Sequence, residues 1–535
     1  MNQNNEMWWQ IYRKNQYRLK KLNFEMILRK SFKDVVTEYV MNSSIAGVKE
    51  ICAPRIGIRY RFIWIILFSM MVGTTCYFLY LLWIATLTKP LVVSMDSSTY
   101  PITEIDFPAV ALCNVNRISH KSLTEFAEEM YPLLAKNNES FSYIRQYFLQ
   151  LGRLLDFSWA ENLRKHPLSE LLAKQYGESK IVIQLMKELA PSCKEMLKMC
   201  TWDGQFVDCM ELFDVRRTVR GHCCAFNYIL GYNSAGKPNS TISKVKRQII
   251  SGPLKGLNVV IDPLVDDYAY PINNIIGFDI FLHDPTHFAD INAGRVIHRI
   301  VEGNTTIHLQ LHSVKQMATQ EVRKYPLSAR QCLFHDEKKE KFGDMYSYSA
   351  CIVSCRIRTV QSLCKCTPYF FPTSENNQHI CTLDKLPCLN QYKEKLLYLY
   401  PYGAMNNEGL EMEIQDSLYC PECLPDCEFT KHYTKAFKLS MEISVLKENS
   451  SKQDSLLYRN GINMSNVCTI SIYQSTEDGV LDRLDIISYW FEVVSNIGGF
   501  AGILLGFSFV SVVEILYFFV LRFITLIIKN YNEYH

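Results

Sequence analysis

The sequence lacks the short motifs on which the common enzyme classes depend. It contains no Gly-x-Ser-x-Gly nucleophile turn, no His-Glu-x-x-His metal helix and no glycine loop of the kind that cradles phosphate groups. Internal repeats, low-complexity tracts and heptad runs are also missing. These absences count against an ectoenzyme, so we expect no catalytic residue and no cofactor.

The chain also has little net charge. It carries 57 Lys and Arg residues against 54 Asp and Glu residues, which gives a net charge of +3. The basic excess is concentrated in residues 1–61, which hold twelve basic and five acidic residues. A basic segment before an apolar one is typical of a membrane anchor with its positive flank in the cytoplasm. The distribution therefore favours a membrane protein over a nucleic-acid-binding one.

Uncharged stretches of membrane length are scarce, because about 20 helical residues are needed to cross a ~30 Å hydrocarbon core. One covers residues 62–87 and has aromatic side chains near both ends, where they anchor a span at the interfaces. The other contains Val493 to Val513. Residues 1–61 show no early apolar run of the kind found in cleavable signal peptides, so we expect the first stretch to be an uncleaved signal anchor.

Basic residues are rare just after the first stretch, where Lys89 is the only one before Arg117. This asymmetry predicts a cytoplasmic N-terminus, and two spans return the C-terminus to the same side of the plasma membrane. The expected parts are a cytoplasmic segment at 1–61, a first transmembrane helix at 62–87, an extracellular domain at 88–486, a second transmembrane helix at 487–528 and a cytoplasmic tail at 529–535.

Cysteine usage agrees with this topology. Of the 19 cysteines, all but Cys52 and Cys76 fall in the expected extracellular domain, and such density is typical of an oxidising compartment. The remaining 17 are an odd number, so at least one thiol is free or pairs between chains. We expect glycans at the five sequons of the same domain, Asn138, Asn239, Asn304, Asn449 and Asn463, whereas the sequon at Asn42 should stay bare.

One pair of cysteines raises a metal alternative, because Cys420-Pro-Glu-Cys423 has the Cys-x2-Cys spacing of zinc sites. The secretory location favours disulfides instead, and ten cysteines between residues 332 and 427 can close five bridges, each of which adds on the order of 2–4 kcal/mol. We therefore expect no metal site.

The extracellular domain shows both strand and helix patterns. Asp106 to Asn116, Gly277 to His283 and Phe437 to Val445 are predicted strands, because they are apolar or alternate apolar with polar residues. Residues 123–155 and 346–360 have the longer apolar spacing of helices. The fold class predicted is a membrane α+β protein, with two transmembrane helices flanking a large disulfide-rich extracellular domain.

The second apolar stretch contains residues that a purely lipid-facing helix does not need. These are four glycines, two serines and a carboxylate: Gly498, Gly499, Gly502, Gly506, Ser508, Ser511 and Glu514. Irregular backbone and ionisable groups occur at membrane depth where they line a water-filled path, which indicates an ion channel. Two simpler interpretations stay open: the glycines at every fourth position can serve helix packing, and Glu514 can reach the interface.

Several blocks together resemble the degenerin/epithelial sodium channel family, in particular its insect pickpocket branch. The blocks are FPAVALCNVNRIS, GHCCAFN, GFDIFLHDP, YSYSACIVSCRIRTVQSLCKCTPYFFP, YCPECLPDCEFTKHYTKAF and SNIGGFAGILLGFSFVSVVEILYFF, within a match that runs from about Ser44 to Phe519. The resemblance implies a trimer with a hand-like ectodomain of palm, finger, thumb and β-ball. It implies a sodium-permeable, amiloride-sensitive type of cation channel, gated by an extracellular stimulus and sensory in role, built as a homo- or hetero-trimer with related subunits.

The resemblance also implies roles for single residues. Gly506-Phe507-Ser508 corresponds to the family's Gly-x-Ser selectivity filter. Ser495 matches a gating position at the outer mouth, and Gly502 matches the binding position of amiloride-type blockers. Glu514 matches a pore carboxylate, and Gly47 matches the glycine of an N-terminal His-Gly gating motif.

The same resemblance implies the disulfides. They would join Cys332–Cys427, Cys351–Cys423, Cys355–Cys420, Cys364–Cys388, Cys366–Cys381, Cys113–Cys223 and Cys200–Cys209. Cys193 and Cys224 remain as an eighth pair, which leaves Cys468 over.

Two positions depart from the family pattern. Phe507 replaces a small residue of the filter, and Ala46 replaces the histidine of the His-Gly motif. Because both departures concern pore elements, a non-conducting or obligate auxiliary subunit is the main alternative. An ATP-gated trimeric channel shares the topology, but the cysteine pattern and the Gly-x-Ser motif count against it. Histidines such as His283 and His287 are read as ordinary residues rather than proton sensors.

Overall fold

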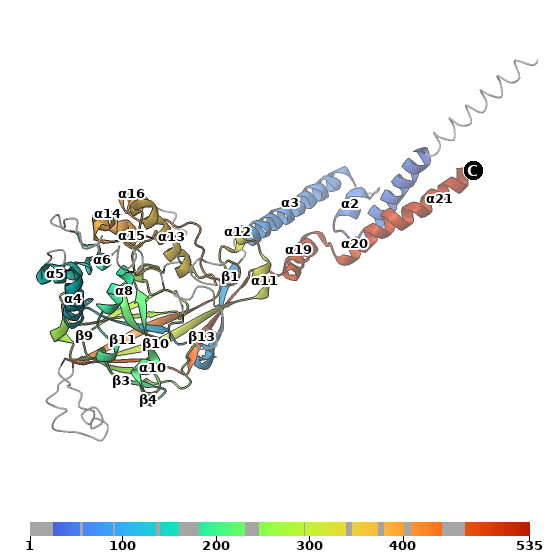
Figure 1. Ribbon diagram of the computed structural model, residues 1–535. Helices are drawn as coiled ribbons and strands as arrows, with labels where there is room; N and C mark the ends of the chain where they lie inside the picture. Colours follow the sequence, from blue (N-terminus) through green and yellow to red (C-terminus); the bar gives the residue numbers. More distant parts are fainter. Residues whose placement is uncertain are drawn as a thin grey trace, which may run out of the picture. The chain divides into compact units, whose positions relative to one another are not determined.

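The computed structural model describes residues 25–53, 57–88, 91–134, 140–159, 181–229, 245–293, 295–338, 345–372, 379–400, 408–440 and 466–534. The chain divides into two compact units (Figure 1). One unit combines Met1–Val92 with Ile486–His535, and the other is Val93–Asp485.

The first unit contains the apolar helices. They are α3 (Ile58–Thr88), α19 (Trp490–Leu505), α20 (Phe509–Leu516), the π-helical turn η8 (Tyr517–Arg522) and α21 (Phe523–Tyr534). Two helical stretches, Ile58–Ile84 and Phe509–Asn532, are long and apolar enough to cross a membrane. The expected second span is therefore two helices rather than one, with an interruption after Leu505.

The N-terminal part of this unit folds back along the C-terminal helices. A helix at residues 25–42 is followed by a loop and by the short helix α2 (Val48–Cys52). Ser31 of the first helix accepts a 2.8 Å hydrogen bond from the Asn530 side-chain amide of α21, and both residues are buried. The two helices lie side by side in Figure 1.

The second unit is built on two β-sheets. The larger sheet has the strand order β1 (Leu91–Pro101), β13 (Asp478–Ile486), β10 (Thr305–Ala318), β12 (Cys468–Gln474), β7 (Leu257–Ile261), β3 (Leu197–Trp202) and β4 (Gln205–Val207), with β11 (Phe429–Ser440) also paired to β10. The smaller sheet has the order β5 (Phe213–Thr218), β6 (Gly221–Phe226), β2 (Ala109–Asn114), β8 (Gly277–His283) and β9 (Ile297–Glu302).

The two sheets pack face to face over a common core. Alternate residues of β2 and β8, such as Val110 and Ile280, meet alternate residues of β10 and β12, such as Leu309 and Ile470, and all four are fully buried. Successive side chains of a strand point to opposite faces, so one face of each sheet is enough to build this layer. The other face of β2 carries Cys113, which bonds to β6.

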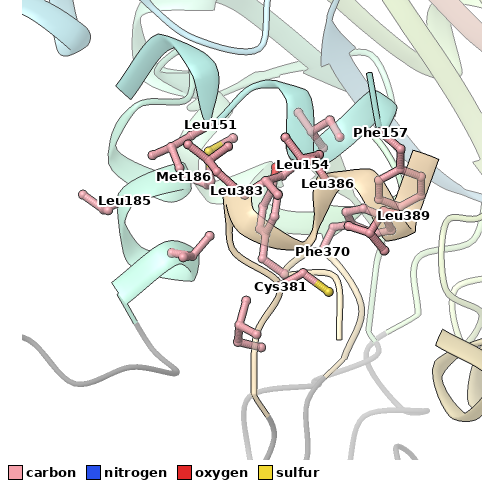
Figure 2. Packing of buried hydrophobic residues seen from close by; sticks show 14 of the residues in the cluster. Leu151, Leu154, Phe157, Leu185, Met186, Phe370, Cys381, Leu383, Leu386 and Leu389 are labelled. Carbon is pink, nitrogen blue, oxygen red and sulfur yellow. The ribbon is translucent and has the colours of Figure 1, made fainter. Parts of the chain in front are cut away.

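Helices cover the rest of the unit. A second apolar core, which we call the helical core, is built mainly by helices. They are α4 (His120–Leu134), α5 (Phe141–Gln150), α6 (Arg153–Asp156), α8 (Ile181–Glu188), α13 (Tyr348–Cys364), α14 (Leu386–Gln391) and α15 (Lys393–Leu397). Figure 2 shows how Leu154 and Phe157 meet Phe370 and Leu389 in this core.

The remaining elements are short. They are α9 (Cys193–Met196), α10 (Cys209–Leu212), α11 (Gln320–Lys324), α12 (Leu327–Arg330), α16 (Glu411–Gln415) and the 3-10 turns η1 (Ile102–Glu104), η4 (Pro253–Lys255), η5 (Val265–Asp267), η6 (Ile291–Ala293) and η7 (Leu383–Lys385).

Eight disulfides staple this unit. Five of them form what we call the cysteine ladder, Cys332–Cys427, Cys351–Cys423, Cys355–Cys420, Cys364–Cys388 and Cys366–Cys381. The other three are Cys113–Cys223, Cys193–Cys224 and Cys200–Cys209. Each expected pair is joined in the structure, and the odd thiol is that of Cys468, which is buried and free.

The ladder follows from the helical repeat of α13. Cys351 and Cys355 are four residues apart, so they share one face of the helix and stack one turn above the other. Their partners Cys423 and Cys420 lie in a loop that descends along that face. Because Cys420 and Cys423 bond to different cysteines of α13, the zinc-like spacing serves two disulfides instead.

Most predicted elements are present, with shifted ends. The strands predicted at 106–116 and 277–283 are β2 and β8, and the helix predicted at 346–360 is α13. The helical region 123–155 is three helices, α4, α5 and α6. The third strand begins at Phe429, eight residues before the predicted start, because its backbone pairs with β10, and residues 441–445 lie outside the described residues.

The disulfide of the cysteine ladder that closes the longest loop gives a test of stability. Cys332–Cys427 closes a loop with a sequence separation of 95. Replacing Cys332 with Ser should destabilise the second unit by roughly 2–4 kcal/mol, because the unfolded chain regains the freedom that the bridge removes. Surface biotinylation of full-length Cys332→Ser should show strongly reduced delivery.

Cys468→Ala is the matched control, since it removes a buried cysteine that forms no disulfide. Its surface delivery should stay close to that of the wild type. Normal delivery of Cys332→Ser, with the other seven bonds unchanged by mass spectrometry, would contradict this role of the bridge.

Candidate functional site

The second apolar segment is interrupted where its sequence is richest in glycine. α19 ends at Leu505, and Gly506 adopts a left-handed conformation with φ 65° and ψ 16°. The N–H groups of Gly506 and Phe507 donate back into α19, to the carbonyl oxygens of Gly502 at 3.0 Å and Ala501 at 3.2 Å. Glycine suits this helix end because a Cβ atom is strained in the left-handed region.

The next helix begins at once, with Ser508 as its N-cap. The Ser508 N–H group donates to Ser511 Oγ at 3.1 Å, and the Ser508 side chain caps the N–H group of Ser511 in return. The tripeptide Gly506–Ser508 thus joins one helix end to the next without any helical turn. Among the described residues, no group donates a hydrogen bond to the carbonyl oxygens of Gly506 and Phe507, so these two oxygens can bind another electropositive group.

An N-terminal loop, residues 43–47, lies against this interruption. The Ala46 N–H group donates to the carbonyl oxygen of Leu505 at 2.9 Å. The Ser44 N–H group donates to Glu514 Oε2 at 3.1 Å, and Ser44 Oγ lies 2.7 Å from Ser511 Oγ. The last carbonyl groups of a helix have no partner within that helix. The loop therefore satisfies one such group and ties α19 and α20 together.

The loop is itself held by the helices on either side of it. Gly47 caps α2 with φ 86°, and a Cβ atom there would lie 3.5 Å from the Phe68 ring of α3. On the other side, Glu38 forms a two-pronged ion pair with Arg522 at 2.8 and 2.9 Å. Two donors of a guanidinium on one carboxylate fix orientation as well as distance. The N-terminal helix is thereby aligned with η8.

Aromatic contacts reinforce the same alignment. Phe32 lies with its ring centroid 6.4 Å from that of Phe519 and 6.2 Å from that of Phe523. Before the interruption, Phe78 of α3 stacks on Phe500 of α19, with ring centroids 5.1 Å apart and an angle of 4° between the ring planes. Offset or edge contacts of this kind add to the burial of the rings.

The structure brings most of the predicted pore residues to one place. Gly47, Glu514 and the tripeptide meet around the N-terminal loop. Gly502 faces the same site, since a Cβ atom there would lie 3.6 Å from the carbonyl oxygen of Phe507. Ser495 is exposed on α19, about three helical turns before the interruption. It does not contact the other predicted residues.

Sequence reasoning marked Ser511 only as a polar residue of the apolar segment, and it missed Ser44, Glu38 and Arg522 as parts of the site. Ser44 and Ser511 contact each other, and Glu38 pairs with Arg522, at sequence separations of 467 and 484. No local pattern marks such pairs. The one available hint was the polar character of Ser511 and Arg522 within an apolar segment, because buried or membrane-embedded polar groups usually have partners.

The glycosylation sequons are only partly covered by the described residues. Asn304 is exposed in the turn between β9 and β10, with φ 59°. Asn138, Asn239, Asn449 and Asn463 lie outside the described residues. A glycan on Asn304 would extend from a turn rather than from a packed face.

Two histidines of the second unit are shielded from solvent. Burial lowers the pKa of His283 to about 4, and its ring Nδ1–H donates to the Asp284 carbonyl oxygen at 2.8 Å. Burial also lowers the pKa of His432 to about 4, where Nδ1 lies 2.8 Å from Ser313 Oγ. Both imidazoles are therefore uncharged near neutral pH, which supports a structural role for His283.

Comparisons with known proteins agree on one family. A family model described as "Amiloride-sensitive sodium channel" matches residues 39–518. Sodium channel protein Nach of Drosophila ananassae is 22% identical, over 91% of this chain and 87% of the relative. The protein of the same name from Drosophila melanogaster is 21% identical, over 96% of this chain and 90% of its own. Pickpocket protein 28 of Drosophila melanogaster is 21% identical, over 92% of this chain and 79% of the relative.

The contact between Ser44 and Ser511 can be tested without any assay of function. Their hydroxyl oxygens lie 2.7 Å apart, so cysteines at both positions have side chains close enough to form a disulfide. Full-length Ser44→Cys/Ser511→Cys protein in membranes, in a Cys52→Ser/Cys76→Ser background, should form an intrachain bond on mild oxidation. Mass spectrometry of peptides from the monomer band detects the bond.

Ser43→Cys/Ser511→Cys is the matched control. The Ser43 hydroxyl is engaged within the loop, where it accepts the Ile45 N–H group at 3.2 Å. This pair should stay unlinked under the same oxidation. Equal cross-linking of both pairs, or none in the Ser44 pair, would show that the loop lies elsewhere.

Proposed function

The chain belongs to the amiloride-sensitive sodium channel family, and from that premise we propose that it is a pore-forming subunit of a trimeric, sodium-permeable channel. The observation that carries the proposal is the tripeptide Gly506–Ser508, a non-helical stretch inside an apolar segment, whose Gly506 and Phe507 carbonyl oxygens accept no hydrogen bond from the described residues. Two relatives, from Drosophila ananassae and Drosophila melanogaster, are named sodium channel proteins, which supports Na⁺ as the permeant ion.

The tripeptide has the chemistry that a cation needs. A Na⁺ ion must exchange hydration water for oxygen ligands as it enters a narrow filter. Three chains around one axis would each supply the carbonyl oxygens of Gly506 and Phe507, and Ser508 would add or orient a hydroxyl oxygen. The Phe507 ring would point away from the axis, because three rings in a narrow pore would block hydrated ions.

Other residues take supporting roles in this proposal. Ser495 and Gly47 would act in gating, Gly502 would border the blocker site, and Glu514 would supply negative charge near the filter. The Ser44 N–H group donates to the Glu514 carboxylate, so a movement of the N-terminal loop would change the position of that charge. Gating would thus reach the filter through the same loop that supports it.

The channel would lie in the plasma membrane with both termini in the cytoplasm. Its cysteine-rich domain at 88–486 would face the outside and receive an extracellular, sensory stimulus. The basic residues at 1–61 and the disulfides of the second unit support this orientation.

A non-conducting auxiliary subunit is the second candidate, because Phe507 and Ala46 depart from the family pattern. The position of Ala46 weakens the part of this argument that rests on the missing histidine. The loop reaches α19 through the Ala46 N–H group, which donates to the Leu505 carbonyl oxygen, so support for the filter does not need a histidine side chain. Phe507 remains the observation that favours the auxiliary role.

Whole-cell recording of the chain, alone and with related subunits, separates the two candidates. A pore-forming subunit should carry cation current in at least one combination, and Ser508→Ala and Phe507→Ala should shift its Na⁺/K⁺ reversal potential. Gly506→Val should abolish the current, because a branched side chain at φ 65° costs on the order of 1–2 kcal/mol in backbone strain alone.

Gly73→Val is the matched control, since Gly73 lies within α3 and a Cβ atom there meets no described atom within 4 Å. It should leave the current unchanged. Current that persists with an unchanged reversal potential in all three tripeptide variants would place the filter elsewhere. If current appears only on co-expression with related subunits, and none of these variants changes it, the chain has the auxiliary role.

Orientation is tested by glycan mass. Replacing Asn138, Asn239, Asn304, Asn449 and Asn463 with Gln should remove every N-linked glycan, because acceptor sites are modified only on the lumenal side of the secretory pathway. Asn42→Gln should leave the mobility on a gel unchanged. A glycosidase-sensitive glycan on Asn42 would reverse the orientation.

A further inference from the structure

The second unit contains a cavity. It has a volume of about 280 Å³ and is bordered by α6, α13, α15, η6, the turn between β5 and β6, and residues 370–371. Sites for small organic ligands are concave, mostly apolar and supplied with a few polar groups. This volume lies just below the roughly 300–1,000 Å³ typical of such sites, which fits a single ring or a short chain rather than a peptide.

Most of the cavity wall is apolar and aromatic. Phe157, Phe370 and Phe371 line it together with Val360 and Leu396. The Phe157 and Phe370 ring centroids are 6.1 Å apart, and Figure 2 shows both rings at the edge of the helical core. Such a wall favours the apolar body of a ligand, because burial of apolar surface is the main source of its binding free energy.

The charged groups of the wall carry an excess of positive charge. They are Arg220, Asp290 and Arg356. Arg356 is almost fully buried and binds Asp290, whose other carboxylate oxygen accepts the Asn292 N–H group at 3.0 Å. Asp290 therefore neutralises Arg356, and Arg220 is left as the extra positive charge of the cavity.

The guanidinium N–H groups of Arg220 are available to a ligand. Its guanidinium donates no hydrogen bond within the described part of the chain, and its only ion pair is a 4.0 Å approach to Asp279. That carboxylate is already held by Arg117 at 2.6 Å and by His298 at 2.9 Å. The Arg220 side chain keeps 29% of its surface exposed, so its donors are reachable.

Arg356 strengthens the same preference. Its Nε and Nη2 atoms are buried and meet no acceptor among the described residues. Buried donors of a charged group normally have partners, and an unpaired one is costly. The unpaired donors of Arg356 and the net positive charge left by Arg220 both favour an anion over a cation in this mostly apolar cavity.

We propose that this cavity binds a small organic acid, with its carboxylate on Arg220 and its aryl or short alkyl body against Phe157, Phe370 and Val360. A carboxylate matches the planar fork of a guanidinium, which holds both oxygens at once. The exposed Tyr398 and the half-buried Asn292 border the same cavity and offer further polar contacts. This site is separate from the tripeptide and does not depend on conduction.

Equilibrium dialysis of radiolabelled phenylacetate against detergent-purified full-length protein tests the site directly. Wild-type protein should bind phenylacetate saturably, and the neutral amide phenylacetamide should bind at least about tenfold more weakly, because it cannot form the charged pair. Arg220→Gln should weaken phenylacetate binding by about 10- to 100-fold, while Arg220→Lys should keep part of it. Leu397→Trp, at the half-buried rim, should lower binding of both probes.

Arg216→Gln is the matched control. Arg216 has a similar exposure, with 31% of its side-chain surface accessible, but it pairs with Asp214 and does not line the cavity. Its variant should bind phenylacetate as the wild type does, and protease resistance should show that each variant is folded. Equal affinity for acid and amide, wild-type binding by Arg220→Gln, or no saturable binding into the millimolar range would overturn the proposal. None of these outcomes bears on whether the chain conducts.

Discussion

An interrupted helix in an apolar segment must find partners for the backbone groups that it releases. At Gly506 the chain solves this problem in two ways. The caps on either side satisfy the N–H groups locally, through Ala501 and Gly502 on one side and Ser511 on the other. The released carbonyl of Leu505 is satisfied from a distance by Ala46. Because backbone polar groups without partners cost several kcal/mol in an apolar medium, the N-terminal loop stabilises the interruption, while the carbonyl oxygens of Gly506 and Phe507 stay open within the described part of the chain.

The second unit is stabilised differently in its sheet and helical regions. The sheets bury a dense apolar layer, in which the central strand β10 pairs with three neighbours, β11, β12 and β13. The helical segment at 332–427 instead depends on five of the eight disulfides. In this segment the bridges act together with an apolar core, because they join the short helices and long connections whose side chains build that core.

The sequence was informative where a signal is local. An alternating pattern located β8, and the i, i+4 cysteines of α13 are adjacent by helical geometry alone. The disulfide partners came from a family resemblance, because spacing cannot choose among the many connectivities of 17 cysteines. β10 was missed, although Ile307, Leu309 and Leu311 alternate with polar residues, since its parallel pairing with β12 spans more than 160 residues. The contact of Ser44 with Ser511 has no local signature at all.

The positions that depart from the family pattern fall where the structure uses backbone atoms. Ala46 acts through its N–H group, which every residue except proline can offer, so the histidine side chain is dispensable for that contact. Gly47 and Gly506 have φ angles of 86° and 65°, where a Cβ atom is strained. These two glycines therefore supply the backbone conformation that positions the loop against the tripeptide. The side chains around it are free to differ as long as they do not fill the space that these two glycines leave.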